Sequence, residues 1–304
     1  MTSRVQARED HAAYRRGIGL VLLAGGFWSI AGLVVRLIEA ATAWQILFYR
    51  SLALTLFLLL VLAVRSGGNP FAAYRKAGRS AVLGGLALVL AFSGSIISLQ
   101  QTTVANAMFL FATAPFMAAL LARPLLGERP RRATWIAMVF AAVGVSIMVG
   151  EGLSLGQGAG NLAAVVSALG FALFTIALRW GRSEDMLPAV SLGGVFMTLV
   201  AGIACVASGD TLIISAHDTA LSLGLGVVQL GFGLSLYTLG SKVVPASELA
   251  LLSMTEVVLG PFWVWLLLGE TASQFTLLGG AILLAAIAGN AVTQLRHRPP
   301  PLAL

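Results

Sequence analysis

The residue with the clearest chemical potential is Glu256, an acid near the middle of an apolar run and about equally far from Pro245 and Leu268. A carboxylate in such a run is costly unless it is protonated or paired, so it marks a functional site by default. One interpretation is that Glu256 binds a proton or a substrate ammonium group in alternation. The other is that it is a protonated carboxyl, hydrogen-bonded to Ser253 or Thr255, that only locks its helix.

A basic residue, Arg50, lies inside another apolar run. A cation there costs about 3 kcal/mol on insertion scales unless it reaches water or forms a pair. Because Arg50 is only about two helical turns from Trp44, we expect its side chain to extend to the external lipid headgroups beside Tyr49 as an anchor. The alternative is that Arg50 attracts a carboxylate at the mouth of a binding site.

Two runs combine glycines with larger polar or aromatic side chains. Trp28 and Ser29 follow Gly25 and Gly26 in the first run, and small residues of this kind let a ligand or a neighbouring helix come close. Gln229, with Tyr237 further along, occupies a later run that is also rich in glycine: Gly224, Gly226, Gly231 and Gly233. In both runs the pattern fits either tight helix packing or a ligand-facing surface.

A third run, from Val104 to Leu121, contains no charge and ends at Arg123 and a turn that closes with Pro130. Pro115 lies in its middle, where it removes a backbone hydrogen bond, so we expect this helix to be bent. The predicted gating residues are Pro115 and, in a later run, Pro261. The predicted substrate-binding residues are Trp28, Ser29, Asn106, Phe109, Thr113, Gln229, Tyr237, Ser253 and Glu256.

Enzymatic chemistry is not expected. The histidines His11, His217 and His297 are far apart in sequence and lie at segment ends, and Cys205 is alone inside an apolar run. A nucleophile with a base, or a cluster of metal ligands, would be needed for catalysis. We therefore expect no catalytic residue, no metal site and no cofactor.

The composition places these residues in a membrane. Hydrophobic residues make up 58% of the 304, charged residues only 10%, and the mean hydropathy is +0.93. A soluble domain has roughly 25% charged residues. The net charge of +7 comes from short basic loops rather than one basic stripe, which favours lipid headgroups over nucleic acid as the partner.

The length allows about ten helices at roughly 20 residues each. We expect an all-α integral membrane protein whose spans begin and end within two to four residues of the following limits. These are 17–37, 43–64, 80–100, 103–122, 132–150, 160–180, 187–207, 217–239, 244–268 and 273–294.

Basic residues give the orientation. Seventeen of the nineteen fall in alternate segments, namely the amino-terminal segment, the loops around 65–79, 123–132, 179–182 and 242, and the carboxyl-terminal tail. Cytoplasmic loops carry such an excess of Lys and Arg. We therefore expect a multi-pass membrane protein with both termini in the cytoplasm and with residues 1–16 and 295–304 as cytoplasmic segments.

The two halves of the chain repeat each other. Gly127-Glu128 matches Gly269-Glu270 at an offset of 142, and GGFWSIAGLVVR at 25–36 is echoed by LGFALFTIALR at 169–179. Five spans per half is an odd number, so the second half enters the membrane from the opposite side. We expect two inverted five-helix repeats, at 17–150 and 160–294, around a central cavity.

These motifs resemble those of the EamA-type families of the drug/metabolite transporter superfamily. The resemblance rests on ATAPFMAALLARPLLGE at 112–128, MTEVVLGPFWVWLLLGE at 254–270 and FYRSLA at 48–53, and it covers nearly the whole chain. One departure is that Glu256 is followed by Val257 and the proline comes at Pro261, which displaces the expected bend by about a turn. The nearest resemblance is to bacterial aromatic amino-acid exporters of the inner membrane.

This resemblance implies a secondary transporter that exports amino acids, aromatic ones included, by alternating access. A sugar-phosphate carrier should place several cations in its spans, and a drug-cation exporter should place a carboxylate in the first span, which has none. A carrier of another small metabolite of these kinds remains the alternative. The expected partners are amino acids and membrane lipid, and a monomer is compatible with the sequence.

Overall fold

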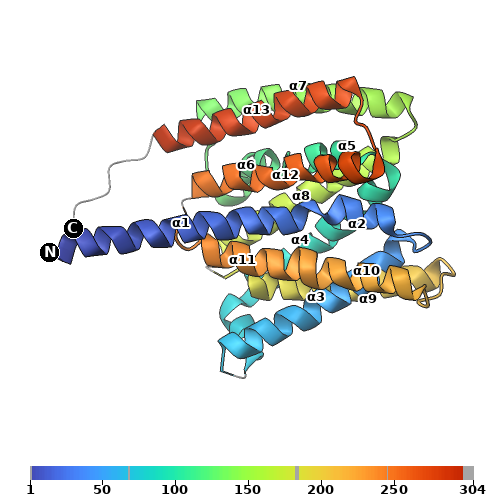
Figure 1. Ribbon diagram of the computed structural model, residues 1–304, viewed down its shortest axis with the longest axis horizontal. Helices are drawn as coiled ribbons and strands as arrows, with labels where there is room; N and C mark the ends of the chain where they lie inside the picture. Colours follow the sequence, from blue (N-terminus) through green and yellow to red (C-terminus); the bar gives the residue numbers. More distant parts are fainter. Residues whose placement is uncertain (1, 68, 182–184, 245, 297–304) are drawn as a thin grey trace.

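The computed structural model describes residues 2–67, 69–181, 185–244 and 246–296, and the regular structure in these ranges is helical. Figure 1 shows the helices lying side by side, with the start of α1 and the end of α13 at the same end of the bundle. We call this end the terminal face and the opposite end the distal face. The helices are α1 (Thr2–Ser29), α2 (Ala31–Leu37), α3 (Ala43–Arg65), α4 (Pro70–Gln101), α5 (Val104–Phe111), α6 (Ala114–Leu126), α7 (Arg132–Ser154), α8 (Gly158–Trp180), α9 (Leu187–Ala207), α10 (Ala216–Gly224), the π-helix η1 (Leu225–Phe232), α11 (Gly233–Gly240), α12 (Ala246–Leu268) and α13 (Gln274–Arg296).

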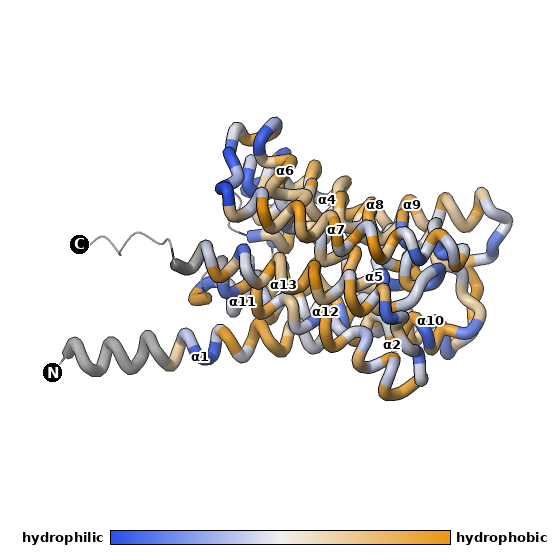
Figure 2. Tube along the Cα trace, turned by 90° about the horizontal axis from the view of Figure 1, so that it is seen from above, coloured by the Kyte–Doolittle hydropathy of each residue, from blue (hydrophilic) through white to orange (hydrophobic). Residues whose placement is uncertain are grey.

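Ten stretches within the described residues are long and apolar enough to cross a membrane, which confirms the predicted number of spans. Figure 2 shows hydrophilic residues gathered at the two ends of the bundle and hydrophobic residues between them. Large apolar side chains such as Ile136, Val139, Phe140 and Ile203 remain exposed along the helices. An exposed apolar belt of this kind is what a lipid-facing surface requires.

The helix packing follows the predicted repeat. Each span of the first half corresponds to the span five places later in the second half. Under this correspondence the contact between α4 and α8 matches the contact between α11 and α1, and the contact between α1 and α12 matches the contact between α8 and α6. The α3–α9 and α7–α13 contacts map onto themselves. The structure is therefore an all-α bundle of two five-span halves related by a pseudo-twofold relationship.

Irregular backbone is found in the first, fourth and eighth spans of the described chain. The first breaks at Ile30, between α1 and α2, and the eighth contains the π-helical segment η1. The fourth breaks between α5 and α6, directly before Pro115, where the Thr113 backbone amide bonds to the carbonyl of Leu110 instead of continuing the helix. Pro115 thus occupies the first turn of α6, a position that proline tolerates because its missing N–H has no partner to lose there.

Helix α12 continues through Pro261 without a break. The structure differs from prediction in the loop at 65–79. Helix α4 begins at Pro70 and turns at Gly78, whose φ of 59° and ψ of −144° are not helical. The basic residues Arg75 and Lys76 therefore lie on a short helical segment ahead of the span rather than in a loop.

Candidate binding site

Arg50 lies inside the bundle. Its residue is only 5% exposed, and the guanidinium carbon lies 5.4 Å from the centre of the Phe92 ring on α4. The expectation that Arg50 extends to the headgroups is therefore wrong. The backbone explains this placement: a Cβ at Gly226 would come within 2.2 Å of the Arg50 carbonyl, so η1 packs directly on α3 and covers the side chain.

The hydrogen bonds of the Arg50 guanidinium are long and incomplete. Nη1 lies 3.5 Å from the hydroxyl of Ser95 and Nη2 lies 3.4 Å from Oε1 of Gln229, while Nε is buried with no partner within the described residues. Good N–H···O bonds measure about 2.9 Å. A buried cation with unused donors in a planar fork is suited to receive a carboxylate.

Gln229 links Arg50 to the first span. Its side chain is 4% exposed, and its Nε2 lies 3.5 Å from the carbonyl of Trp28, on the turn just before α1 ends. The π-helix η1 places Gln229 on the side that meets α1, and Gly233, the first residue of α11, meets α1 as well. Segments of π-helix are frequent at functional sites. The predicted glycine-rich run therefore contributes both tight packing and a polar side chain.

Two aromatic rings stand beside this polar group. The rings of Trp28 and Tyr237 lie 5.2 Å apart, and the Trp28 indole lies against Gly233, where a Cβ would come within 2.3 Å of Nε1. That Nε1 is buried without a hydrogen-bond partner among the described residues. Tyr237 also interacts with the Ser253 side chain of α12. The two rings thus form an apolar wall of the site, and the Trp28 indole N–H remains available as a hydrogen-bond donor.

Glu256 lies on α12 where that helix meets α1: a Cβ at Gly25 would contact Thr255 and the backbone of Glu256. Its carboxyl group is partly buried, and its charge interacts with that of Arg50. In the described part of the chain no hydrogen bond joins Glu256 to Ser253 or Thr255, and the Ser253 hydroxyl donates to the carbonyl of Leu249. The locking hydrogen bonds considered for Glu256 are thus not present.

The other predicted residues lie elsewhere. Ser29 is fully buried and accepts a hydrogen bond of 3.0 Å from the indole Nε1 of Trp263, which ties α1 to α12. Phe109 packs against Gly280 of α13, and the Thr113 hydroxyl donates to the carbonyl of Leu110 at the break before α6. Asn106 belongs to a separate group near the distal face. The structure therefore gathers Trp28, Gln229, Tyr237, Ser253 and Glu256, but not these four.

Sequence reasoning missed two pairs of residues. Ser95 and Phe92, on α4, complete the surroundings of Arg50. The one sequence signal for this shared role is their spacing of three residues, which places both on one face of a helix. Arg36 was recognised only as a basic residue at the end of its span. It forms an ion pair of 2.7 Å with Glu270 and donates to the carbonyls of Leu99 and Thr102.

Glu270 also accepts a hydrogen bond of 2.7 Å from the backbone amide of Val104, the first residue of α5. Together with Arg36 it joins α2, the end of α4, the start of α5 and the end of α12 at the distal face. At the terminal face, Arg179 forms an ion pair with Glu128. Each pair thus contains the Glu of one Gly-Glu motif and an Arg from the other half of the chain.

The described residues show no arrangement for catalysis. No group of three metal-ligating side chains is found among them. Gly152 to Gly156 has the G-x-S-x-G spacing of hydrolases, but its Ser154 is exposed on the last turn of α7 and donates to the carbonyl of Glu151. A hydrolase nucleophile instead stands on a sharp turn between a strand and a helix.

Comparisons with known proteins agree with this arrangement. The chain is 23% identical over 278 residues to the pseudopaline exporter CntI of Pseudomonas aeruginosa, covering 90% of this chain and 94% of the exporter. It is 25% identical over 198 residues to an uncharacterized transporter of Archaeoglobus fulgidus, covering 65% of this chain and 71% of that protein. A solved crystal structure with 17% identity superposes with a TM-score of 0.65 over 94% of this chain and 99% of the other, which supports the fold.

The model of the EamA-like transporter family matches residues 15–150 and again residues 158–292. These two matches include both Gly-Glu motifs and nearly all described helices. Members of this family are transporters, and the transmembrane bundle of this chain encloses the buried Arg50 beside the polar side chain of Gln229. The chain therefore belongs to the EamA-like transporter family, as a multi-pass membrane protein of two tandem repeats.

Proposed function

We propose that this transporter exports amino acids, aromatic ones included, across the bacterial inner membrane by alternating access. The observation that carries the proposal is the buried Arg50, whose guanidinium has unused donors in the described part of the chain, with the acid Glu256 on the nearby helix α12. A zwitterion offers the two complementary charges. The carboxylate would take the unused donors of Arg50, and the ammonium group would approach Glu256.

The aromatic pair supports the choice of side chain. An aromatic or aliphatic substrate side chain would pack against the rings of Trp28 and Tyr237, which already stand 5.2 Å apart. Offset or tilted aromatic contacts contribute about 0.5–1.5 kcal/mol beyond their buried area. Because this wall selects shape only loosely, it favours a broad range of amino acids over a single one.

The two ion pairs support alternating access. Arg36 and Glu270 close the distal face, and Arg179 and Glu128, their counterparts in the repeat, close the terminal face. Both pairs are formed in this structure. Opening toward either side would then break one pair and retain the other, and pseudo-symmetric halves commonly exchange conformations in this way. The break at Ala112, before Pro115, would serve as a hinge within the fourth span.

The orientation is proposed from charge. The cytoplasmic side would be the terminal face, since the basic residues of the alternate loops gather there. A cysteine at Ser208, which is exposed at the distal end of α9, should react with an impermeant thiol reagent added from the periplasm. One at Ser66, at the other end of the bundle, should not. Reversed labelling would overturn the orientation.

A second candidate function has one observation in its favour. The identity with the pseudopaline exporter extends over 90% of this chain. Export of a metabolite of another class would use the same charged pair, provided that the metabolite carried both a carboxylate and a cationic nitrogen. Substrate therefore has to be assigned by transport measurements, because fold alone does not determine it.

Counterflow across proteoliposomes, with each of the twenty amino acids in turn, tests the proposal. We expect exchange of several amino acids. We also expect the exchange rate of the Arg50→Lys protein to be at least tenfold lower, because the point charge of Lys cannot replace the planar guanidinium group of Arg. The matched control is Arg65→Lys, since Arg65 forms a partly exposed ion pair of 3.4 Å with Asp185 outside the site. Exchange of pseudopaline or another metabolite with both a carboxylate and a cationic nitrogen, with none of any amino acid, would establish the second candidate instead.

A further inference from the structure

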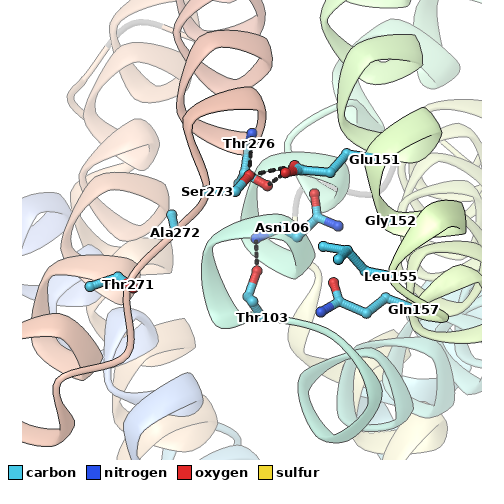
Figure 3. Close-up of a pocket in the computed structure, with 10 residues that line it drawn as sticks. All are labelled: Thr103, Asn106, Glu151, Gly152, Leu155, Gln157, Thr271, Ala272, Ser273 and Thr276. Atoms are coloured by element: carbon cyan, nitrogen blue, oxygen red, sulfur yellow. Dashed lines mark hydrogen bonds between the residues drawn. The ribbon is translucent and has the colours of Figure 1, made fainter.

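A separate polar pocket lies near the distal face, between the two halves of the chain. It has a volume of about 320 Å³ and is bounded by the start of α5, the end of α7 and the connection from α12 to α13. Figure 3 shows Asn106, Glu151 and Ser273 turned toward the same space from these three segments. Arg50 and Glu256 do not line it, so this pocket is distinct from the binding site described above.

The lining of the pocket is rich in hydrogen-bond acceptors. The carboxylate of Glu151 accepts hydrogen bonds from the hydroxyls of Ser273 and Thr276, which hold one of its oxygens at the pocket wall. No Lys or Arg is among the lining residues. The pocket therefore contains a carboxylate that hydroxyl groups orient and no basic side chain neutralises.

Asn106 adds a buried acceptor without a partner. The residue is only 1% exposed, and its Nδ2 donates to Oδ1 of Asn161 and to the hydroxyl of Thr102. Its own Oδ1 receives no hydrogen bond from any described residue. Buried polar atoms are nearly always hydrogen-bonded. Because Asn106 lines the pocket, a small turn of its side chain would present the unpaired oxygen to a donor that arrives with a ligand.

The surrounding charge agrees with a cationic ligand. Several acids lie at the distal face, whereas the described basic side chain there, Arg36, is already paired with Glu270. These acids are Glu39, Glu151, Asp210, Asp218 and Glu270. A metal ion fits less well, since hard cations take six or more oxygen ligands, with several carboxylates or waters among them. An ammonium group, with three donors and no acceptor, matches one carboxylate, one amide oxygen and hydroxyls.

We propose that this pocket binds the protonated primary amine of a small organic molecule at the distal face, with Glu151 and Asn106 Oδ1 as its acceptors. The volume is within the range of small-molecule sites. Two sources share this chemistry: the ammonium group of an exported substrate on its way out, and a free amine in the medium. The proposal does not depend on the class of substrate that the central site carries.

Benzylammonium is the test ligand, because it has no carboxylate for Arg50, and benzyl alcohol is its neutral counterpart. Its binding to the full-length Glu256→Gln protein in lipid nanodiscs is measured by calorimetry. The Glu256→Gln substitution prevents the acid of the central site from contributing. We expect benzylammonium to bind and benzyl alcohol not to bind. Adding Glu151→Gln, which keeps the hydrogen bonds from Ser273 and Thr276, should weaken binding at least tenfold, and adding Asn106→Ala should weaken it several-fold.

Unchanged benzylammonium affinity in the Glu151→Gln protein, or equal binding of benzyl alcohol, would overturn the proposal. A thermal unfolding curve for each variant separates loss of binding from loss of folding. The two sources of the amine are separated by competition. If phenylalanine displaces benzylammonium from the Glu256→Gln protein, and Glu151→Gln abolishes this displacement, the ligand is the exported substrate. If only amines displace it, the ligand is an external amine. Failure of amino-acid counterflow would refute the proposed transport function and leave these binding results intact.

Discussion

Arg36 and Glu270 form an ion pair of 2.7 Å at the distal face, and the residues at the corresponding positions of the repeat, Arg179 and Glu128, form the ion pair of the terminal face. The offsets are 143 positions for the arginines and 142 for the glutamates. The distal pair is more buried, with side chains 25% and 20% exposed against 47% and 46%. It also forms hydrogen bonds with three backbone groups, so the two ion pairs differ in how firmly they tie their segments together.

Glu270→Gln should therefore open the distal face more than Glu128→Gln opens the terminal face. Hydrogen bonds to charged groups contribute about 1.5–3 kcal/mol, whereas exposed ion pairs contribute about 0–1 kcal/mol. The measurement is the reaction of a cysteine at Ser253, in a protein without Cys205, with an impermeant thiol reagent added from each side. Glu270→Gln should raise labelling from the distal side about tenfold or more, and Glu128→Gln should raise terminal-side labelling by less. Identical labelling of all variants from both sides would contradict the closure role.

Gly226 and Gly224 provide a matched pair for testing the approach of η1 to α3. A Cβ at Gly226 would lie 2.2 Å from the Arg50 carbonyl, whereas one at Gly224 would meet nothing within 4 Å. Gly226→Ala should separate the two helices, lower the thermal unfolding temperature and reduce transport. Gly224→Ala should be neutral or stabilising, because Ala favours a helix over Gly by about 1 kcal/mol. Equal melting temperatures for the two variants would show that η1 does not pack as described.

The sequence was sufficient to predict the spans and the repeat because both depend on composition along the chain. Apolar runs of the right length become spans whatever their neighbours are, and the Gly-Glu motif occurs once in each half of the sequence. The position of Arg50 could not be obtained in this way. Hydropathy says that a segment crosses the membrane but not how it is rotated, so the contact of Arg50 with Gln229 depends on how α3 packs on η1.

Local rules had a similar limit at the interruptions. Proline chemistry predicted an irregular fourth span, and the helix does end before Pro115. The same rule predicts a bend at Pro261, where α12 stays continuous, so the rule does not tell a helix that ends at proline from one that continues through it. The break at Ile30 and the π-helical path of η1 coincide with close tertiary contacts, such as Gly32 against Val104 and Gly226 against Arg50, which depend on residues far away in the sequence.

Pro115→Ala should slow transport more than Pro261→Ala does. At Pro115 the chain has already left the helix, so Ala would let α5 and α6 join across Ala112 and Thr113 and would stiffen the proposed hinge. At Pro261 the helix is continuous, and Ala would mainly restore one hydrogen bond. Initial counterflow rates at equal protein insertion measure the difference, and we expect a several-fold loss for Pro115→Ala alone. Wild-type rates in the double variant would refute the hinge.

The last prediction concerns Glu256, whose charge interacts with Arg50 and whose carboxyl makes no hydrogen bond within the described residues. Such a carboxyl is free to exchange a proton for a substrate ammonium group, because nothing else occupies it. Glu256→Gln keeps the shape and the hydrogen-bonding capacity of the side chain but removes its ability to ionise. The variant should therefore insert and fold normally, which thermal unfolding in detergent can verify.

Transport by the Glu256→Gln protein should fall at least tenfold and should lose its dependence on pH. In the wild type, lower pH should reduce the rate of amino-acid exchange, because a proton on Glu256 removes the negative charge that attracts the substrate ammonium group. Counterflow measured from pH 5 to pH 8 in both proteins tests this directly, and Glu248→Gln, on the first turn of the same helix, is the control. A Glu256→Gln protein that transports at the wild-type rate at every pH would mean that Glu256 has only a structural role and that the ammonium group is bound elsewhere.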